Sequence, residues 1–349
     1  MGSSPERTEG EGPEAGTGAP AQSRKPSARR RLLVTSARIG LALCLLTILF
    51  SRVGWHDVVE AFASLAWWWI PLLLGIRILA LFVQSQRWRL FLADQRIRPS
   101  SAHLFKSYWI ARFFNNFLPG QLGGDAYRVL YGLDPGVSRT QVASSVVAER
   151  IAGLIGLTSI AAAGGWAGFQ LMRASGLEFL PMIATAMAIG LLVIAIRPTM
   201  ATSLAGLARA LPASRLSHLL ARLADALMAH VGQRTTLVGG IVLSAVFYAL
   251  LAFESYLALR AFGVEIEPAS VLVVAPTIAL IISVPITVNG WGTAEAASVF
   301  LYTQLGVAET DALSMALLTR LNFMLMGGMG GLLYLWQSWH APARANHVA

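Results

Sequence analysis

Six apolar runs, each about as long as a membrane-spanning helix, dominate this chain of 349 residues. They cover residues 32–50, 65–83, 142–168, 177–196, 237–262 and 313–336. A helix of about 20 apolar residues crosses roughly 30 Å of hydrocarbon. Because backbone N–H and C=O groups in lipid must be paired within the chain, each run is expected to be a helix. The composition, 55% hydrophobic and 13% charged, agrees, and we predict an all-α polytopic membrane protein.

Positive charge predicts which helix ends face the cytoplasm. Residues 1–31 are rich in Gly, Pro, Ala and Ser and end in a basic cluster, so we expect a disordered basic cytoplasmic tail. The loop after the second run is also basic, whereas the expected outer loops hold little beyond Arg52 and Arg173. The basic residues assigned to the inner loop are Arg87, Arg89, Arg96, Arg98 and Lys106. An amphipathic cytoplasmic connector over 198–236 and a tail over 338–349 follow, and both termini are expected inside.

A polar stretch interrupts the apolar pattern between Arg112 and Arg128. A helix loses hydrogen bonds at Pro119 and Gly120, and irregular backbone at membrane depth is tolerated only where it lines a cavity or is buried in protein. We therefore expect 104–118 to enter from the cytoplasm, break and return as a re-entrant hairpin; a cytoplasmic loop is the alternative. The candidate site residues here are Arg112, Asn115, Asn116, Gly120, Gln121, Gly123, Gly124, Asp125 and Arg128.

The chain repeats itself at an offset of 170 residues. Between 136–150 and 306–320, five of fifteen aligned positions are identical, where about one is expected for unrelated sequences. The same offset pairs Gly120 with Gly290, Asp125 with Glu295 and Arg150 with Arg320. Residues 268–288 could span the membrane alone, but the repeat favours a second hairpin that dips in from the outside, breaks at Asn289 and Gly290, and leaves over 294–303.

The duplication predicts two halves of opposite orientation. Residues 32–168 form the first and 169–337 the second, each with three spanning helices and one re-entrant broken-helix hairpin. The first hairpin would open to the cytoplasm and the second to the outside, which is the inverted-repeat plan of many secondary transporters. The two tips, near Gly120 and Gly290, are therefore expected to approach each other at the membrane centre.

Two hairpin tips would bring helix N-termini, which carry partial positive charge, close to one point. We expect an anion to bind there, with arginine forks suited to phosphate and amides suited to a head group. The candidate residues beyond the first stretch are Glu149, Arg150, Asn289, Gly290, Gly292, Glu295 and Arg320. For any single charged residue a structural ion pair is an equally good interpretation. Asp125 and Glu295 would act as helix caps or as proton carriers, with capping slightly favoured.

The sequence predicts no metal, cofactor or nucleic-acid site. The six histidines show none of the paired spacings of zinc ligands. The single cysteine, Cys44, falls in the first apolar run, where packing is its expected role. No P-loop is present, so ATP is not the expected direct energy source, and an ion gradient or downhill scrambling remains.

Two segments resemble the signatures of a known family. Residues 116–125 read Asn-Phe-Leu-Pro-Gly-Gln-Leu-Gly-Gly-Asp, and 285–295 read Pro-Ile-Thr-Val-Asn-Gly-Trp-Gly-Thr-Ala-Glu. They are similar to the paired signatures of the lysylphosphatidylglycerol synthase transmembrane region, also called the flippase-like domain family, and the resemblance extends over about 32–337. That family commonly has a charged pair where this chain has Gly124 and Asp125, and an arginine where it has Ala294.

The resemblance implies a flippase, and not an enzyme, that moves an anionic phospholipid or a polyprenyl-phosphate-linked lipid between leaflets of a bacterial inner membrane. Only thirteen residues follow Trp336, so no soluble aminoacyl transferase domain is expected, and a separate lipid-modifying enzyme is a candidate partner. Two alternatives stay open: a membrane enzyme acting on a lipid-linked phosphate or sugar, and a non-transporting accessory subunit. The lipid, the direction, the driving ion and the oligomeric state are not specified.

Overall fold

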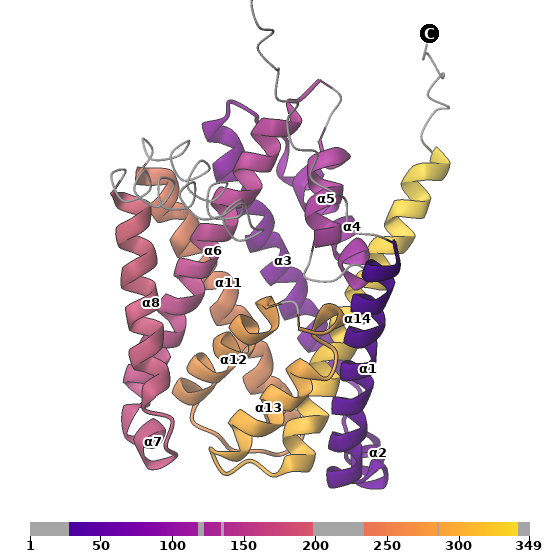
Figure 1. Ribbon diagram of the computed structural model, residues 1–349, viewed down its shortest axis with the longest axis vertical. Coiled ribbons are helices and arrows are strands. Elements are labelled where there is room, and N and C mark those ends of the chain that lie inside the picture. Colours follow the sequence, from indigo (N-terminus) through magenta and orange to yellow (C-terminus); the bar gives the residue numbers. More distant parts are fainter. Residues whose placement is uncertain (1–27, 118–121, 134–135, 198–233, 285, 341–349) are drawn as a thin grey trace, which may run out of the picture.

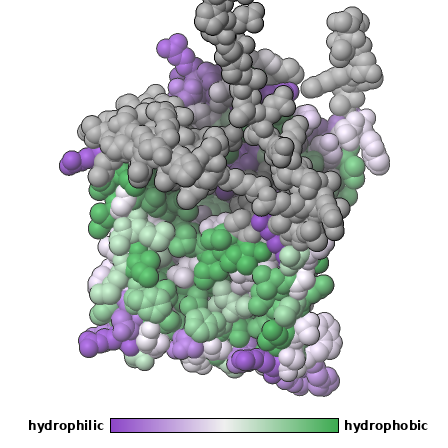
Figure 2. Space-filling view, viewed as in Figure 1, coloured by the Kyte–Doolittle hydropathy of each residue, from purple (hydrophilic) through white to green (hydrophobic). Residues whose placement is uncertain are grey.

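The computed structural model describes residues 28–117, 122–133, 136–197, 234–284 and 286–340 (Figure 1). Within these ranges the chain is helical, without strands. Six helices are long and apolar enough to span a membrane: Thr35–Val53, Trp69–Asp94, Arg139–Ala167, Phe179–Ile196, Thr235–Ala261 and Glu309–His340. Each overlaps one of the six predicted runs. Figure 2 shows hydrophobic side chains across the middle of one face and hydrophilic ones along its lower edge, the pattern of a multi-pass membrane protein.

The first two spans, α1 (Ala28–Val53) and α3 (Trp69–Asp94), are separated by a short helix, α2 (Trp55–Ala63). Gly54, with φ of 82°, lies between α1 and α2 in a conformation that favours glycine. The predicted end of the second helix near Val83 is wrong, because α3 continues to Asp94. Arg87 therefore lies on a helix and is buried, rather than in a basic loop.

Two helices of intermediate length are shorter than a membrane span. Helix α4 (Ser101–Phe117) has 17 residues and α12 (Pro268–Ser283) has 16, whereas about 20 are needed at 1.5 Å per residue. Each packs against a second short helix, α5 (Leu122–Leu130) beside α4 and α13 (Thr293–Thr303) beside α12. Figure 1 shows the first pair in the upper half of the molecule and the second pair in the lower half.

The end of α12 bears on the alternative left open for 268–288. The helix stops at Ser283, and a single turn of 3-10 helix, η2 (Val288–Gly290), precedes α13. Asn289, Gly290 and Gly292 have φ values of 51°, 72° and 75°, which are incompatible with a continuous right-handed α-helix. The helix Pro268–Ser283 is thus followed by a break before α13, and a re-entrant course of this segment remains a prediction.

The remaining helices complete two similar sets. Helix α6 (Arg139–Ala167), α7 (Phe169–Ala174) and α8 (Phe179–Ile196) follow the first hairpin, α11 (Arg234–Ala261) precedes the second, and α14 (Glu309–His340) follows it. The order of a span, two short helices and a span thus occurs in α3 to α6 and again in α11 to α14. Helices α6 and α14 begin at Arg139 and Glu309, 170 residues apart. The inverted relation of the halves and their boundaries remain predictions.

Several sequence predictions fall outside the described residues. They are the Pro119–Gly120 break with the site residues Gly120 and Gln121, the tails over 1–27 and 341–349, and most of the connector, over 198–233. The approach of Gly120 to Gly290 is therefore untested. What the structure does place together is α4 and η2, which contact each other, so the first hairpin reaches the tip of the second.

Candidate functional site

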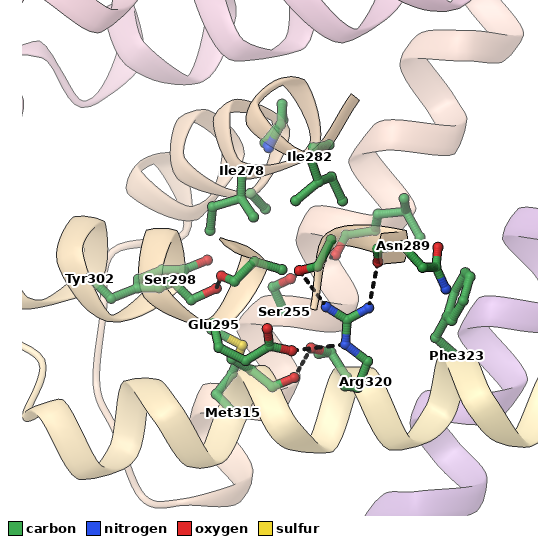
Figure 3. A pocket seen from close by; sticks show the side chains of 18 of the residues that line it. Ser255, Ile278, Ile282, Asn289, Glu295, Ser298, Tyr302, Met315, Arg320 and Phe323 are labelled. Atoms are coloured by element: carbon green, nitrogen blue, oxygen red, sulfur yellow. Dashed lines mark hydrogen bonds and ion pairs between the residues drawn. The ribbon is translucent and has the colours of Figure 1, made fainter. Parts of the chain in front are cut away.

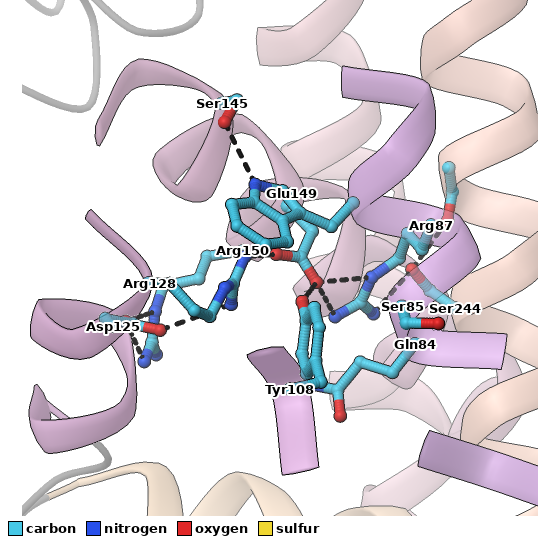
Figure 4. Close-up of polar contacts among 12 residues, drawn as sticks. Gln84, Ser85, Arg87, Tyr108, Asp125, Arg128, Ser145, Glu149, Arg150 and Ser244 are labelled. Carbon is cyan, nitrogen blue, oxygen red and sulfur yellow. Dashed lines mark hydrogen bonds and ion pairs between the residues drawn. The ribbon is translucent and has the colours of Figure 1, made fainter. Parts of the chain in front are cut away.

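Four carboxylates inside the helical bundle hold arginines from other helices. Glu149 and Asp125 belong to one group, which we call the first cluster: Arg87, Tyr108, Asp125, Arg128, Glu149 and Arg150 (Figure 4). Glu295 lines a cavity (Figure 3), and Glu254 holds Arg77, which lines the same cavity. These residues include members of both predicted hairpins.

Glu149 is the centre of the first cluster. It lies on α6 with 1% of its side chain exposed and pairs with Arg87 of α3 and Arg128 of α5. Its Oε1 accepts from Arg87 Nε and Nη2 at 3.1 and 2.7 Å and also from the Tyr108 hydroxyl of α4. Arg87 also donates to Ser244 of α11 at 3.0 Å. The Glu149 carboxylate of α6 thus links the first hairpin (α4 and α5) to α3, and Arg87 extends this network to α11.

Arg128 is held by aromatic rings as well as by charge. Its guanidinium carbon lies 4.2 and 4.3 Å from the ring centroids of Trp88 and Tyr108. Trp88 is itself fixed by an indole hydrogen bond of 3.0 Å to Ser145. A cation in contact with two aromatic rings and bonded to a buried carboxylate has little freedom to follow a ligand. The geometry therefore gives Arg128 a structural role, although the sequence made it a candidate ligand donor.

Asp125 and Arg150 form an ion pair, the first clasp, that joins the start of α5 to α6. Arg150 Nε donates to Asp125 Oδ2 at 2.6 Å, and Arg128 is 3.4 Å from Oδ1. The Arg150 side chain is 44% exposed, so this pair lies at the edge of the bundle. The cap of α5 comes from Asn115, whose Oδ1 accepts from the Gly124 N–H at 2.6 Å.

Glu295 and Arg320 form the equivalent pair, the second clasp, between α13 and α14. Arg320 Nε donates to Glu295 Oε1 at 2.8 Å, and its Nη1 and Nη2 donate to the carbonyls of Asn289 and Gly290 at 3.1 and 3.0 Å. Glu295 Oε2 accepts from the Gly292 N–H at 2.7 Å. Figure 3 shows the guanidinium between the hairpin tip and the carboxylate. Glu295 is therefore a helix cap and an ion-pair partner at once.

The two clasps occupy repeat-related positions. The offset of 170 residues relates Asp125 to Glu295 and Arg150 to Arg320, and in both halves the acid of the returning helix pairs with the arginine of the next span. Capping was favoured for both acids. The cap hydrogen bond is present for Glu295, whereas Asp125 has the ion pairs and Asn115 has the cap.

Gly292 tests how tightly the second tip is packed. An added Cβ would lie 2.8 Å from the Ala42 carbonyl of α1, and φ is 75°. We expect Gly292→Ala to lower the free energy of unfolding by about 1–3 kcal/mol from backbone strain, with a further loss from the contact. Gly263→Ala is the matched control, since φ is 78° and nothing lies within 4 Å of the new Cβ. If a denaturant titration showed the same loss of unfolding free energy for Gly292→Ala and Gly263→Ala, the close contact between α1 and the second tip would be contradicted.

A cavity of about 180 Å³ lies against the second clasp, between α11, α12, η2, α13 and α14. Of the predicted site residues, Asn289, Gly290, Glu295 and Arg320 line it. The other described candidates lie outside its lining: Arg112, Asn115, Asn116, Gly123, Gly124, Asp125, Arg128, Glu149 and Arg150, with Gly292 at the nearby tip. The structure thus divides the predicted single site into the first cluster and this cavity.

Arg77 of α3 reaches the cavity from the other half of the chain. It lines the wall and holds Glu254 of α11 at 2.8 Å through Nε and 2.6 Å through Nη2. Glu254 is fully buried and also lies 3.4 Å from the Asn322 amide. A bidentate pair of this kind fixes the orientation of both side chains.

Arg112 has no carboxylate partner among the described residues. Its Nη2 donates to the neutral Gln84 amide at 2.9 Å, and its guanidinium lies 5.5 Å from the ring centroid of Phe323. Phe323 lines the cavity, so Arg112 lies at the cavity edge. Asn116, one turn later, packs against Gly327 of α14, which has no room for a side chain there.

Sequence reasoning missed Arg77, Arg87, Tyr108 and Glu254 as site residues. Arg77 was detectable, because it is a charge within the second apolar run, where charges are costly. Arg87 was detectable from Trp88, Phe91 and Leu92, whose spacing continues the helix. Among the described residues no group of His, Cys, Asp or Glu is arranged to hold a metal ion.

Comparison with known proteins gives one family. The model of the lysylphosphatidylglycerol synthase TM region matches residues 33–328, which is most of the chain. No curated protein sequence matches. The matched range includes both clasps, the Glu149 centre and the cavity.

Proposed function

Because the chain belongs to the family of the lysylphosphatidylglycerol synthase TM region, we propose that it moves an anionic lipid between the two leaflets of a membrane. The lipid is an anionic phospholipid or a polyprenyl-phosphate-linked lipid, and the protein does not change it chemically. A bacterial inner membrane with both termini in the cytoplasm is the proposed setting. A lipid-modifying enzyme is the proposed protein partner, and nucleic acid is not a partner.

The observation that carries the proposal is the charge inside the bundle. Without the Asp125–Arg150 pair at the edge, the Glu149 centre, the second clasp, the Arg77–Glu254 pair and Arg112 contain five arginines and three carboxylates among the described residues, a net charge of +2. On insertion scales each charge at the centre of a membrane helix costs about 2.5–3.5 kcal/mol. An excess of buried arginines over carboxylates does not stabilise a helical bundle. An anionic headgroup would neutralise this excess.

The two clasps supply the moving parts of the proposed mechanism. Each ties a returning hairpin helix to the next span, and the hairpins lie in opposite halves of the molecule (Figure 1). If one clasp opens while the other is closed, its hairpin moves away and the polar interior becomes accessible from that leaflet. Alternation between the clasps would then pass a headgroup across, as inverted repeats do in secondary transporters.

The test is a translocation assay with product analysis. Pure protein in vesicles that contain fluorescent phosphatidylglycerol is exposed to an impermeant quencher, and the lipids are then analysed by mass spectrometry. The proposal predicts that inner-leaflet label becomes quenched only in vesicles with protein, while the lipid mass stays the same. A changed lipid mass would support the enzyme alternative. Protection equal to that of empty vesicles would support the accessory-subunit alternative.

A further inference from the structure

Two arginines are among the residues that line the cavity, and their donors are engaged differently. Arg320 donates to two backbone carbonyls of the hairpin tip as well as to Glu295. Arg77 has Glu254 as its one described partner: Nε donates to Oε1 at 2.8 Å, and Nη2 lies 2.6 Å from Oε2. An anion in the cavity can therefore bind Arg77 without breaking the tip, in competition with a single carboxylate.

The two members of the Arg77–Glu254 pair differ in their access to the cavity. The Arg77 side chain is 18% exposed and lines the wall, whereas the Glu254 side chain is fully buried and is not part of the lining. A ligand can thus reach the cation and not the carboxylate. If an anion takes Arg77, Glu254 remains buried as an unpaired charge, and a carboxylate in that situation takes up a proton.

No other described cation is bonded to Glu254. Arg77 and, from α4, Arg112 are the cations that act on it, and Arg112 is hydrogen-bonded to Gln84. Helix α12 packs against α11 and has no titratable residue. The charged groups of α6, α14 and α11 itself have partners of their own: Glu149 with Arg87 and Arg128, Arg150 with Asp125, Arg320 with Glu295, and Arg260 with Glu265. Loss of Arg77 would therefore leave Glu254 without a bonded cation.

Asn322 of α14 has a group for each form of Glu254. Its Nδ2 lies 3.4 Å from Glu254 Oε1, and its Oδ1 is buried without a hydrogen-bond partner among the described residues. A half-turn of the amide exchanges these two atoms, so Oδ1 can accept from a carboxyl O–H. An unsatisfied buried acceptor is costly, and a protonated Glu254 would satisfy this one.

The repeat indicates that a carboxylate is not required to hold an arginine at this position. The offset of 170 residues pairs Glu254 with Gln84, and the Gln84 amide oxygen accepts from Arg112 Nη2 at 2.9 Å. The first half thus holds its arginine with an amide, which does not titrate. The carboxyl group of the second half adds a negative charge that a proton can remove.

We propose that Glu254 couples the movement of an anion to one proton. The anion binds Arg77 in place of Glu254, and Glu254 takes a proton from water, which it returns when the anion leaves and Arg77 comes back. This rests on the proposed function and names the ion that moves with the lipid. Arg77 and Glu254 sum to zero charge before binding. Arg77, a singly charged anion and protonated Glu254 also sum to zero, so no uncompensated charge is buried in either state.

The first test measures proton uptake when lipid binds to the purified full-length protein in detergent. The probe is dioctanoyl phosphatidylglycerol, whose phosphodiester keeps one negative charge near neutral pH. Titration calorimetry in two buffers of different ionisation enthalpy gives the number of protons taken up. We expect about one proton for each bound lipid, and an affinity that rises up to about tenfold for each unit by which the pH is lowered.

Glu254→Gln should abolish both effects. It should also bind the lipid more tightly than the wild type at neutral pH, because a neutral amide competes less strongly for Arg77. Glu265→Gln, at the exposed Arg260–Glu265 pair, is the matched control and should keep the proton uptake of the wild type. Lipid binding by the wild type without proton uptake, or equal uptake by Glu254→Gln, would overturn the proposal.

The second test needs no ligand. Arg77→Gln removes the cation, so Glu254 should be protonated at neutral pH, and the infrared spectrum should gain the carbonyl band of a protonated carboxyl group. That band should be absent from the double variant with Arg77→Gln and Glu254→Gln. A folded Arg77→Gln protein without the band would contradict the proposal, whichever lipid the protein binds.

Coupling and translocation fail independently. Proton uptake at Glu254 without lipid movement between leaflets would contradict the proposed function and leave the proton site standing. Lipid movement that does not respond to a pH gradient across the vesicle membrane, together with lipid binding without proton uptake, would contradict the coupling alone.

Discussion

Replacement of Glu149 by alanine is expected to lower the free energy of unfolding by about 3–5 kcal/mol, the usual cost of removing one partner from a buried ion pair. Arg87 and Arg128 both depend on this carboxylate, and both are about 5% exposed at the side chain. Without it Arg87 stays buried with no carboxylate partner among the described residues, and Arg128 keeps only its longer contact of 3.4 Å with Asp125. The measurement is a denaturant titration of the purified protein in detergent micelles.

The Arg260–Glu265 pair provides the matched control for Glu149. Their side chains lie 3.1 Å apart, and that of Glu265 is 85% exposed. Glu265→Ala should therefore cost less than about 1 kcal/mol, as exposed pairs do. A Glu149→Ala protein as stable as this control would contradict the view that Glu149 holds the first hairpin in place.

Replacement of Arg320 by glutamine is expected to slow lipid translocation by roughly tenfold to a hundredfold, since each hydrogen bond to a charged group contributes about 1.5–3 kcal/mol. The substitution removes the contact with Glu295 and the bonds to the carbonyls of Asn289 and Gly290. The second tip then loses its anchor on α14. The rate is measured in vesicles at matched amounts of folded protein.

Arg150→Gln should slow translocation less than Arg320→Gln. Arg150 is 44% exposed and among the described residues is held by Asp125 alone, whereas Arg320 also holds the backbone of the tip. Arg260→Gln, at the exposed pair, should leave the rate unchanged. Full rates for Arg150→Gln and Arg320→Gln together would show that the clasps take no part in lipid movement.

The sequence predicted the features that depend on local pattern. The six spans follow from apolar length, and the broken second hairpin follows from Asn289, Gly290 and Gly292, whose φ values are positive. The offset of 170 residues predicted that Asp125 and Glu295 occupy equivalent positions in the two halves. The structure then placed each beside its arginine, Asp125 with Arg150 and Glu295 with Arg320.

The sequence did not predict which charges neutralise one another. Glu149 receives donors from α3, α4 and α5, which are brought together only by packing. Arg128 is a free cation in the sequence and a stacked, ion-paired one in the structure. Arg87 was assigned to a loop because its positive charge is typical of inner loops. The spacing of Trp88 and Leu92, which indicates that the helix continues, was given less weight. Pairing across a bundle depends on tertiary distances, which one-dimensional patterns do not contain.

Photo-crosslinking tests the claim that the headgroup crosses through the interior of the bundle. A phosphatidylglycerol probe with a photoreactive group on its glycerol is irradiated in vesicles with the protein, and labelled peptides are identified by mass spectrometry. Label is predicted on the peptides that contain Asn289, Glu295, Ser298, Thr319 and Phe323, which line the cavity beside the second clasp, and the amount of label should fall in the Arg320→Gln variant. Label confined to the exposed faces of α1 and α8, unchanged in that variant, would contradict passage through the interior.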